Sequence, residues 1–161
     1  MSRSHPRLMT GGALLVLAGL SALSSGMAAA ADAGSPQAVI EVRQASFKKM
    51  GAAMKTIVDQ LKTDAPDKAR MAAAALVIGS YTAEVRGWFP AGSGAEAGVD
   101  TDALPYIWEA RAKFDAIADR LAPEAKTMTT VLAGDDMAAV RAQAKTLGGV
   151  CSDCHHSFRA D

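Results

Sequence analysis

The sequence predicts an all-α fold, an antiparallel up-down-up-down four-helix bundle. Beyond residue 31 the chain is rich in alanine and poor in runs of β-branched residues. In four segments apolar residues recur every three or four positions, the spacing that gathers side chains on one face of an α-helix. Mostly short connections between these segments favour neighbouring helices that run in opposite directions.

The first 31 residues predict a secretory signal peptide. Arg3 and Arg7 precede the apolar run GGALLVLAGLSALSSGM, and alanines at 28–31 suit a signal peptidase. The run is too short, and too rich in glycine and serine, for a convincing membrane span, with an uncleaved anchor as the alternative. We expect cleavage after Ala30 or Ala31, export to the periplasm without stable membrane insertion, and one domain over residues 32–161.

The charge balance argues against a nucleic-acid partner. The chain has 17 basic and 17 acidic residues, and the predicted signal carries two of the basic ones and none of the acidic ones. The remaining chain therefore has a formal net charge of −2. A nucleic-acid interface calls for a basic patch, which this composition does not suggest.

Local signals place the first two helices. Ser35 can cap a helix that has Pro36 in its first turn and ends near Lys62. Asp67 can cap a second helix, which we expect to run to about Trp88. The apolar stripe of the first helix, interrupted by one arginine, comprises Ile40, Arg43, Phe47, Met50, Met54, Ile57 and Leu61.

The second half of the chain begins with an irregular stretch, FPAGSGAEAGVDTDALP, whose glycines and prolines predict a surface loop. A third helix is expected from about Leu104, with Pro123 marking a short continuation. Gly134 and Asp135 are expected to cap the fourth helix. Its stripe comprises Met137, Val140, Ala144, Leu147, Cys151, Cys154 and Phe158.

The only two cysteines stand in the motif VCSDCHHSFR, three positions apart and directly before His155. A disulfide would close too small a loop on a helix to stabilise the fold much. Zinc is a second alternative, but a closed structural site needs four ligands and this cluster supplies three. The third alternative is covalent haem attachment, in which two thioether bonds hold the porphyrin and the imidazole reaches the iron. Spacing and export favour one covalently bound haem c.

The chain resembles the cytochrome c′ family, whose haem motif lies near the end of the last helix of a four-helix bundle. The resemblance covers about residues 36–160. It is carried by Arg43 and Gln44, by the stretch from Trp88 to Trp108, and by the C-terminal CSDCHHSFR. The position of the motif, together with the other two features, is more specific than Cys-x-x-Cys-His alone.

The resemblance implies roles for five residues. Cys151 and Cys154 would form the thioether links, and His155 would be the axial ligand of the haem iron. Arg159 would lie beside the proximal haem face. Arg43 would contact a haem propionate. This agrees with the residue itself, because an arginine within an apolar stripe needs an anion as its partner. The alternative for Arg43 is a long side chain that extends to solvent at the bundle end.

The resemblance places the residue four positions after Arg43 on the far side of the iron, and here it is Phe47. Family members with methionine there are six-coordinate and low-spin, and those with an apolar residue are five-coordinate. Phenylalanine has no donor atom, so we expect an empty sixth position. The alternative is that Met50, one turn further, ligates the iron. His156 is rotated by about 100° from His155 and is expected to face solvent or the propionate side.

These features predict a periplasmic single-electron carrier whose five-coordinate haem iron binds nitric oxide or carbon monoxide behind Phe47. The alternative is a six-coordinate electron carrier with Met50 as sixth ligand. We do not expect an enzyme, because no histidine remains for acid–base chemistry on the distal side. The redox partner is unidentified, and the resemblance favours a homodimer formed through the first two helices.

Overall fold

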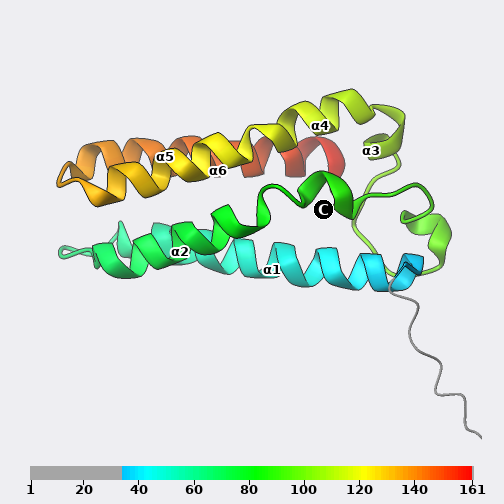
Figure 1. The fold of residues 1–161 in the computed structure, drawn as a ribbon, viewed down its shortest axis with the longest axis horizontal. Coiled ribbons are helices and arrows are strands. Elements are labelled where there is room, and N and C mark those ends of the chain that lie inside the picture. Colours follow the sequence, from blue (N-terminus) through cyan, green and yellow to red (C-terminus); the bar gives the residue numbers. More distant parts are fainter. Residues whose placement is uncertain (1–33, 161) are drawn as a thin grey trace, which may run out of the picture. The chain divides into compact units, whose positions relative to one another are not determined.

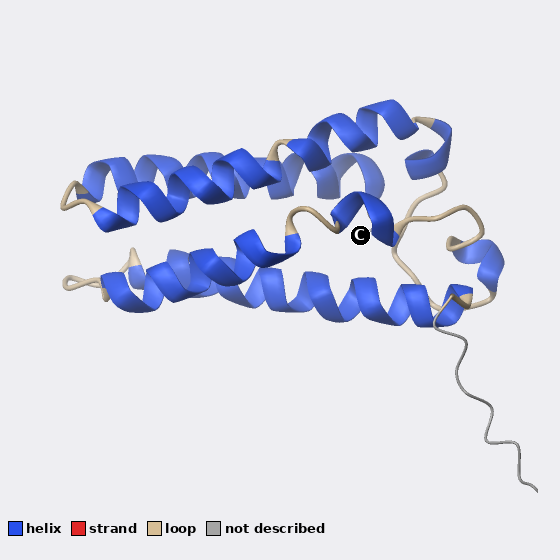
Figure 2. Ribbon diagram, in the orientation of Figure 1, coloured by secondary structure: helices blue, strands red, loops and turns tan. Residues whose placement is uncertain are grey.

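The computed structural model describes residues 34–160, so the predicted signal peptide and its cleavage site lie outside the described residues. Its regular structure is helical (Figure 2). The α-helices are α1 (Pro36–Gln60), α2 (Lys68–Tyr81), α3 (Tyr106–Glu109), α4 (Arg111–Asp119), α5 (Leu121–Ala133) and α6 (Met137–Phe158). Two short 3₁₀ helices, η1 (Val85–Trp88) and η2 (Ala95–Ala97), lie between α2 and α3.

Helix α1 begins where its sequence signals place it. The Ser35 hydroxyl accepts a hydrogen bond from the Ala38 amide at 3.2 Å, and Pro36 occupies the first turn. The residues that α1 buries are Ile40, Arg43, Ser46, Met50, Ala53 and Ile57. Phe47 and Met54, predicted on the same stripe, are only half-buried. The apolar face of α1 therefore has a buried centre and a partly open edge.

Helix α2 is shorter than the sequence predicted. The Asp67 carboxylate caps it by accepting from the Arg70 amide at 3.0 Å, but the α-helix ends at Tyr81 and not near Trp88. Beyond Tyr81 the chain winds more tightly, with i→i−3 hydrogen bonds such as the Gly87 amide to the Glu84 carbonyl at 2.8 Å. This turn buries Trp88 in the core, where it is 7 % exposed.

The third predicted helix is divided into segments. Pro105 precedes α3, as expected from the Leu104 start, but the backbone at Ala110 leaves the helical region and separates α3 from α4. The continuation at Pro123 is α5, a full helix of 13 residues and not a short one. Helices α4 and α5 follow each other nearly in line and together form the third long element of the bundle (Figure 1).

Helix α6 begins one residue later than predicted. Asp136, and not Gly134 or Asp135, caps it by accepting from the Ala138 and Ala139 amides at 2.9 and 3.1 Å. The Asp135 carboxylate, which was expected to cap the helix, forms an ion pair with Lys68 at 2.8 Å. This ion pair links the start of α2 to the α5–α6 turn.

The long elements α1, α2, α4 with α5, and α6 form the predicted antiparallel four-helix bundle (Figure 1). Helix α2 packs on both α1 and α5, and α5 packs on α6. The loop between η1 and α3 is pinned to the bundle end by Trp108, whose indole donates to the Phe89 and Pro90 carbonyls at 3.3 and 3.0 Å. Within residues 34–160 no helix is long and apolar enough to cross a membrane.

Candidate functional site

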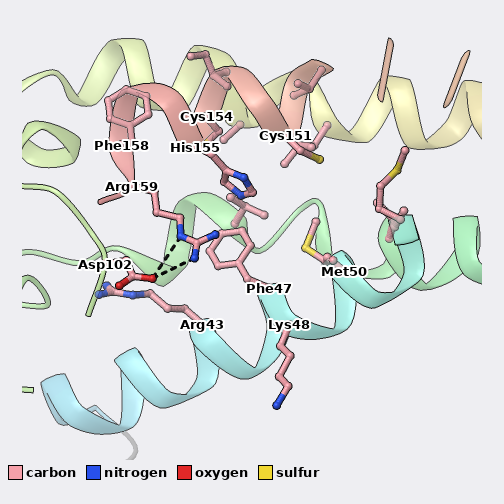
Figure 3. A pocket seen from close by; sticks show the side chains of 18 of the residues that line it. Arg43, Phe47, Lys48, Met50, Asp102, Cys151, Cys154, His155, Phe158 and Arg159 are labelled. Carbon is pink, nitrogen blue, oxygen red and sulfur yellow. Dashed lines mark hydrogen bonds and ion pairs between the residues drawn. The ribbon is translucent and has the colours of Figure 1, made fainter. Parts of the chain in front are cut away.

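A cavity of about 850 Å³ lies between α1, α4 and α6 (Figure 3). Cofactor sites in proteins commonly measure about 300–1,000 Å³ and are mostly apolar. Apolar side chains from all three helices line most of this cavity, among them Phe47, Ile117 and Val150. The cavity therefore has the size and the lining of a cofactor site.

One wall of the cavity carries the cysteine–histidine motif. Cys151 and Cys154 are both half-buried on α6, and both thiols are free. One helical turn separates them, so they lie on the same face. His155 projects from α6 into the cavity toward Phe47 (Figure 3). The structure thus brings the two thiols and the imidazole predicted from the motif to a single cavity.

The surroundings keep these three groups neutral. Burial raises the pKa of the Cys151 thiol, and burial together with Cys151 raises the pKa of Cys154 to about 11. Burial, and next the Arg159 cation, lower the pKa of His155. At neutral pH the imidazole is therefore uncharged, and a neutral imidazole is the form that binds a metal.

The facing wall is formed by α1. The Phe47 ring meets Trp88 edge-on, with centroids 5.1 Å apart and planes at 85°, and lies 6.1 Å from Phe89. These contacts hold the ring in the cavity, opposite His155 (Figure 3). Met50 also lines the cavity but is 7 % exposed and belongs to the hydrophobic core.

Arg43 is buried at one end of the cavity. Its side chain is 2 % exposed, so it does not extend to solvent. Its guanidinium donates to the Ser93 hydroxyl at 3.1 Å and the Thr101 hydroxyl at 2.7 Å, and it lies 4.7 Å from the centre of the Phe89 ring. Burial lowers its pKa. In the described chain no carboxylate forms an ion pair with Arg43.

Arg159 lines the cavity near the end of α6 and forms an ion pair with Asp102 at 3.3 Å (Figure 3). The backbone reinforces this link: the Leu104 amide donates to the Phe158 carbonyl at 3.0 Å, and the Ala160 amide to the Asp102 carbonyl at 2.8 Å. The link joins the loop before α3 to the cysteine–histidine motif. His156 is exposed and does not line the cavity.

Three residues at this site were not predicted from the sequence: Ser93, Thr101 and Asp102. They lie in the irregular loop, and their partners Arg43 and Arg159 are 50 to 58 positions away along the chain. Serine, threonine and aspartate are ordinary loop residues. No local pattern marks these as different from the other polar residues of the loop.

The donor set fits a covalently attached haem. Two protonated thiols one turn apart and a neutral imidazole share an apolar cavity with a buried arginine that has no carboxylate partner among residues 34–160. These are the groups needed for two thioether links, one iron ligand and one propionate contact. In the same part of the chain no cluster of three or more His, Cys, Asp or Glu side chains is placed to hold a bare metal ion.

Known proteins share this architecture along nearly the whole domain. The family model described as Cytochrome C' matches residues 38–159. A cytochrome c' of Rhodopseudomonas palustris is 36 % identical over 148 residues, which are 91 % of this chain and 95 % of the relative.

Two solved structures extend the likeness to three dimensions. The cytochrome c' of Thermochromatium tepidum aligns with a TM-score of 0.74 and 26 % identity, over 79 % of this chain and 98 % of that one. A cytochrome c' described as having an unusual ligand-controlled dimer dissociation aligns with a TM-score of 0.72 and 28 % identity, over the same shares.

Proposed function

The chain belongs to the cytochrome c′ family of haem electron carriers, and from this premise we propose that it is a periplasmic protein with one haem c, able to bind nitric oxide or carbon monoxide at a five-coordinate iron. One observation carries the proposal. The cysteine–histidine motif and Phe47 line opposite walls of the same cavity, which is large enough for a cofactor.

The residues of α6 hold the cofactor in this proposal. Cys151 and Cys154 form the thioether bonds, and His155 provides the axial nitrogen. When bound, the haem supplies an iron that changes between the ferric and ferrous states and can bind a diatomic gas. Arg43 offers a buried cation to a propionate, a pairing that is favourable because the anion and the cation then compensate each other away from water.

Phe47 controls the second axial position. Its ring has no donor atom, and its packing against Trp88 and Phe89 keeps it in the cavity opposite His155. This arrangement favours a five-coordinate iron that a small ligand reaches only by displacing the ring. A six-coordinate carrier with Met50 as ligand is the second candidate, supported by the place of Met50 on the cavity wall. The burial of Met50 in the core favours a packing role.

Electron transfer suits the site better than catalysis does. The side chain opposite His155, that of Phe47 (Figure 3), has no group that exchanges protons, and acid–base catalysis of a peroxidase type needs one at that position. The redox partner is a second periplasmic protein that exchanges single electrons. With a formal charge of −2 after removal of residues 1–31, nucleic acid is not among the proposed partners.

A homodimer formed through α1 and α2 is part of the proposal. Valine and leucine side chains are exposed on these helices, with Val42 55 %, Leu76 62 % and Val77 40 % accessible. A surface of this kind is stabilised when a second copy covers it. A structural relative is described as a dimer, and we extend that state to this protein.

The visible spectrum of the purified mature protein tests the proposal. We expect haem that resists acid–organic extraction, a mature mass equal to the cleaved chain plus one haem, and a high-spin ferrous spectrum that changes when carbon monoxide is added. Extractable haem would contradict covalent attachment. A low-spin ferrous spectrum that is lost in Met50→Leu would instead support the six-coordinate candidate.

A further inference from the structure

The loop over residues 89–103 encloses the guanidinium of Arg43. Ser93 contacts one of its terminal nitrogens at 3.1 Å and Thr101 the other at 2.7 Å. The two hydroxyls come from the two halves of the loop, and the ring of Phe89 lies against the guanidinium at 4.7 Å. Three contacts from one segment of chain thus hold Arg43.

Each hydroxyl is oriented by a second hydrogen bond. Ser93 is 1 % exposed and donates its proton to the Pro90 carbonyl at 2.8 Å, so its oxygen can only accept from Arg43. The Thr101 oxygen also accepts from the Ala103 amide, at 3.2 Å. Both oxygens are therefore presented to the guanidinium as fixed acceptors, before any anion binds.

The loop holds the charge of Arg43 without cancelling it. Hydroxyls and a phenyl ring are neutral, whereas a carboxylate would compensate the cation. The acidic group that acts electrostatically on Arg43 is Glu96, but its carboxylate accepts a hydrogen bond from the Gly94 amide at 3.1 Å and forms no ion pair with Arg43. Within residues 34–160 no carboxylate pairs with the buried Arg43 cation. The guanidinium is therefore available to an anion in the cavity.

We propose that Ser93 and Thr101 are positioning residues, which hold Arg43 in the orientation that engages a haem propionate and thereby help to set the reduction potential. This inference rests on the proposed function, in which the cavity holds the haem. In this role each hydroxyl acts through Arg43 and not on the cofactor directly. A positive charge held near the haem stabilises the more negative ferrous state, so a guanidinium that is no longer held lowers the potential.

The test is the reduction potential of the haem-loaded protein, measured by spectroelectrochemistry. We expect Thr101→Val to lower the potential in the same direction as Arg43→Leu and by a smaller amount, and Ser93→Ala to do the same. Thr101→Ser retains the hydroxyl and should restore the wild-type value. Thr129→Val is the matched control, because it removes a half-buried hydroxyl whose one hydrogen bond within residues 34–160 is to the Ala125 carbonyl, at 3.1 Å.

A double variant separates positioning from a general loosening of the loop. In the Arg43→Leu background, Thr101→Val should cause no further shift, because no guanidinium remains to be held. An equal shift in both backgrounds would overturn the inference. Ser93→Ala supplies an independent measurement if Thr101→Val does not fold, which its thermal unfolding curve reveals.

The remaining outcomes distinguish this inference from the proposed function. If Arg43→Leu shifts the potential but neither Thr101→Val nor Ser93→Ala does, the positioning role is wrong while the contact between Arg43 and the haem stands. If Arg43→Leu leaves the potential unchanged, both the positioning role and the proposed role of Arg43 are wrong.

Discussion

Replacing Phe47 by alanine should accelerate the entry of carbon monoxide to the ferrous protein. In the structure the ring is held by two aromatic contacts, with Trp88 at 5.1 Å and Phe89 at 6.1 Å. Each such contact is worth about 0.5–1.5 kcal/mol beyond the area that it buries. A ligand that must displace the ring has to break both, at a cost of about 1–3 kcal/mol, which corresponds to roughly a 5- to 150-fold change in rate.

Rapid mixing of the reduced protein with carbon monoxide, followed at the Soret band, measures the association rate. Phe47→Ala should raise it by that factor. Trp88→Leu should raise it less, because it removes only one of the contacts that hold the ring. Tyr106→Leu is the matched control: Tyr106 does not line the cavity, and the aromatic pair that it loses, with Phe158 at 5.6 Å, does not involve Phe47. An unchanged or lower rate in Phe47→Ala, or an equal increase in the control, would refute the blocking role of Phe47.

Three further predictions concern attachment, coordination and stability. Cys151→Ala combined with Cys154→Ala should abolish covalent attachment, and acid–organic extraction should then remove all haem; retained haem would contradict the thioether assignment. Phe47→Met should move the absorption spectrum toward low spin by offering a thioether, whereas Met50→Leu should leave the spectrum unchanged. A spectrum that changes in Met50→Leu and not in Phe47→Met would mean that the iron faces Met50. Asp102→Asn should lower the free energy of unfolding by at most about 1 kcal/mol in a denaturant titration, because the ion pair it removes is exposed. The partners in that pair are 62 % and 56 % accessible, and a larger loss would show that this link carries more of the fold than its exposure implies.

Features that depend on neighbours within a few positions could be predicted from the sequence. Ser35 and Asp67 cap their helices as expected, because a cap needs only a side-chain oxygen and an amide three residues away. The bundle follows from helical spacing of apolar residues. Cys151, Cys154 and His155 lie together on one wall of the cavity because they belong to a single helix.

Local signals were less reliable where a helix ends. The α-helical pattern of α2 continues to Trp88, but the helix stops at Tyr81, because a tighter turn there places Trp88 in the core and against Phe47. The continuation beyond Pro123 is a full helix because α5 packs against both α2 and α6. Tertiary packing overrides weak local preferences in both places.

By itself the sequence determined the bundle, the cysteine–histidine motif and the arginine in the apolar stripe of α1. Only the tertiary structure decided what surrounds that arginine. Ser93 and Thr101 reach Arg43 across 50 and 58 positions, so no spacing pattern can relate them. Their contacts with Arg43 exist because the loop folds back over the N-terminal part of α1. Water is excluded there, and the buried guanidinium needs hydrogen-bond acceptors.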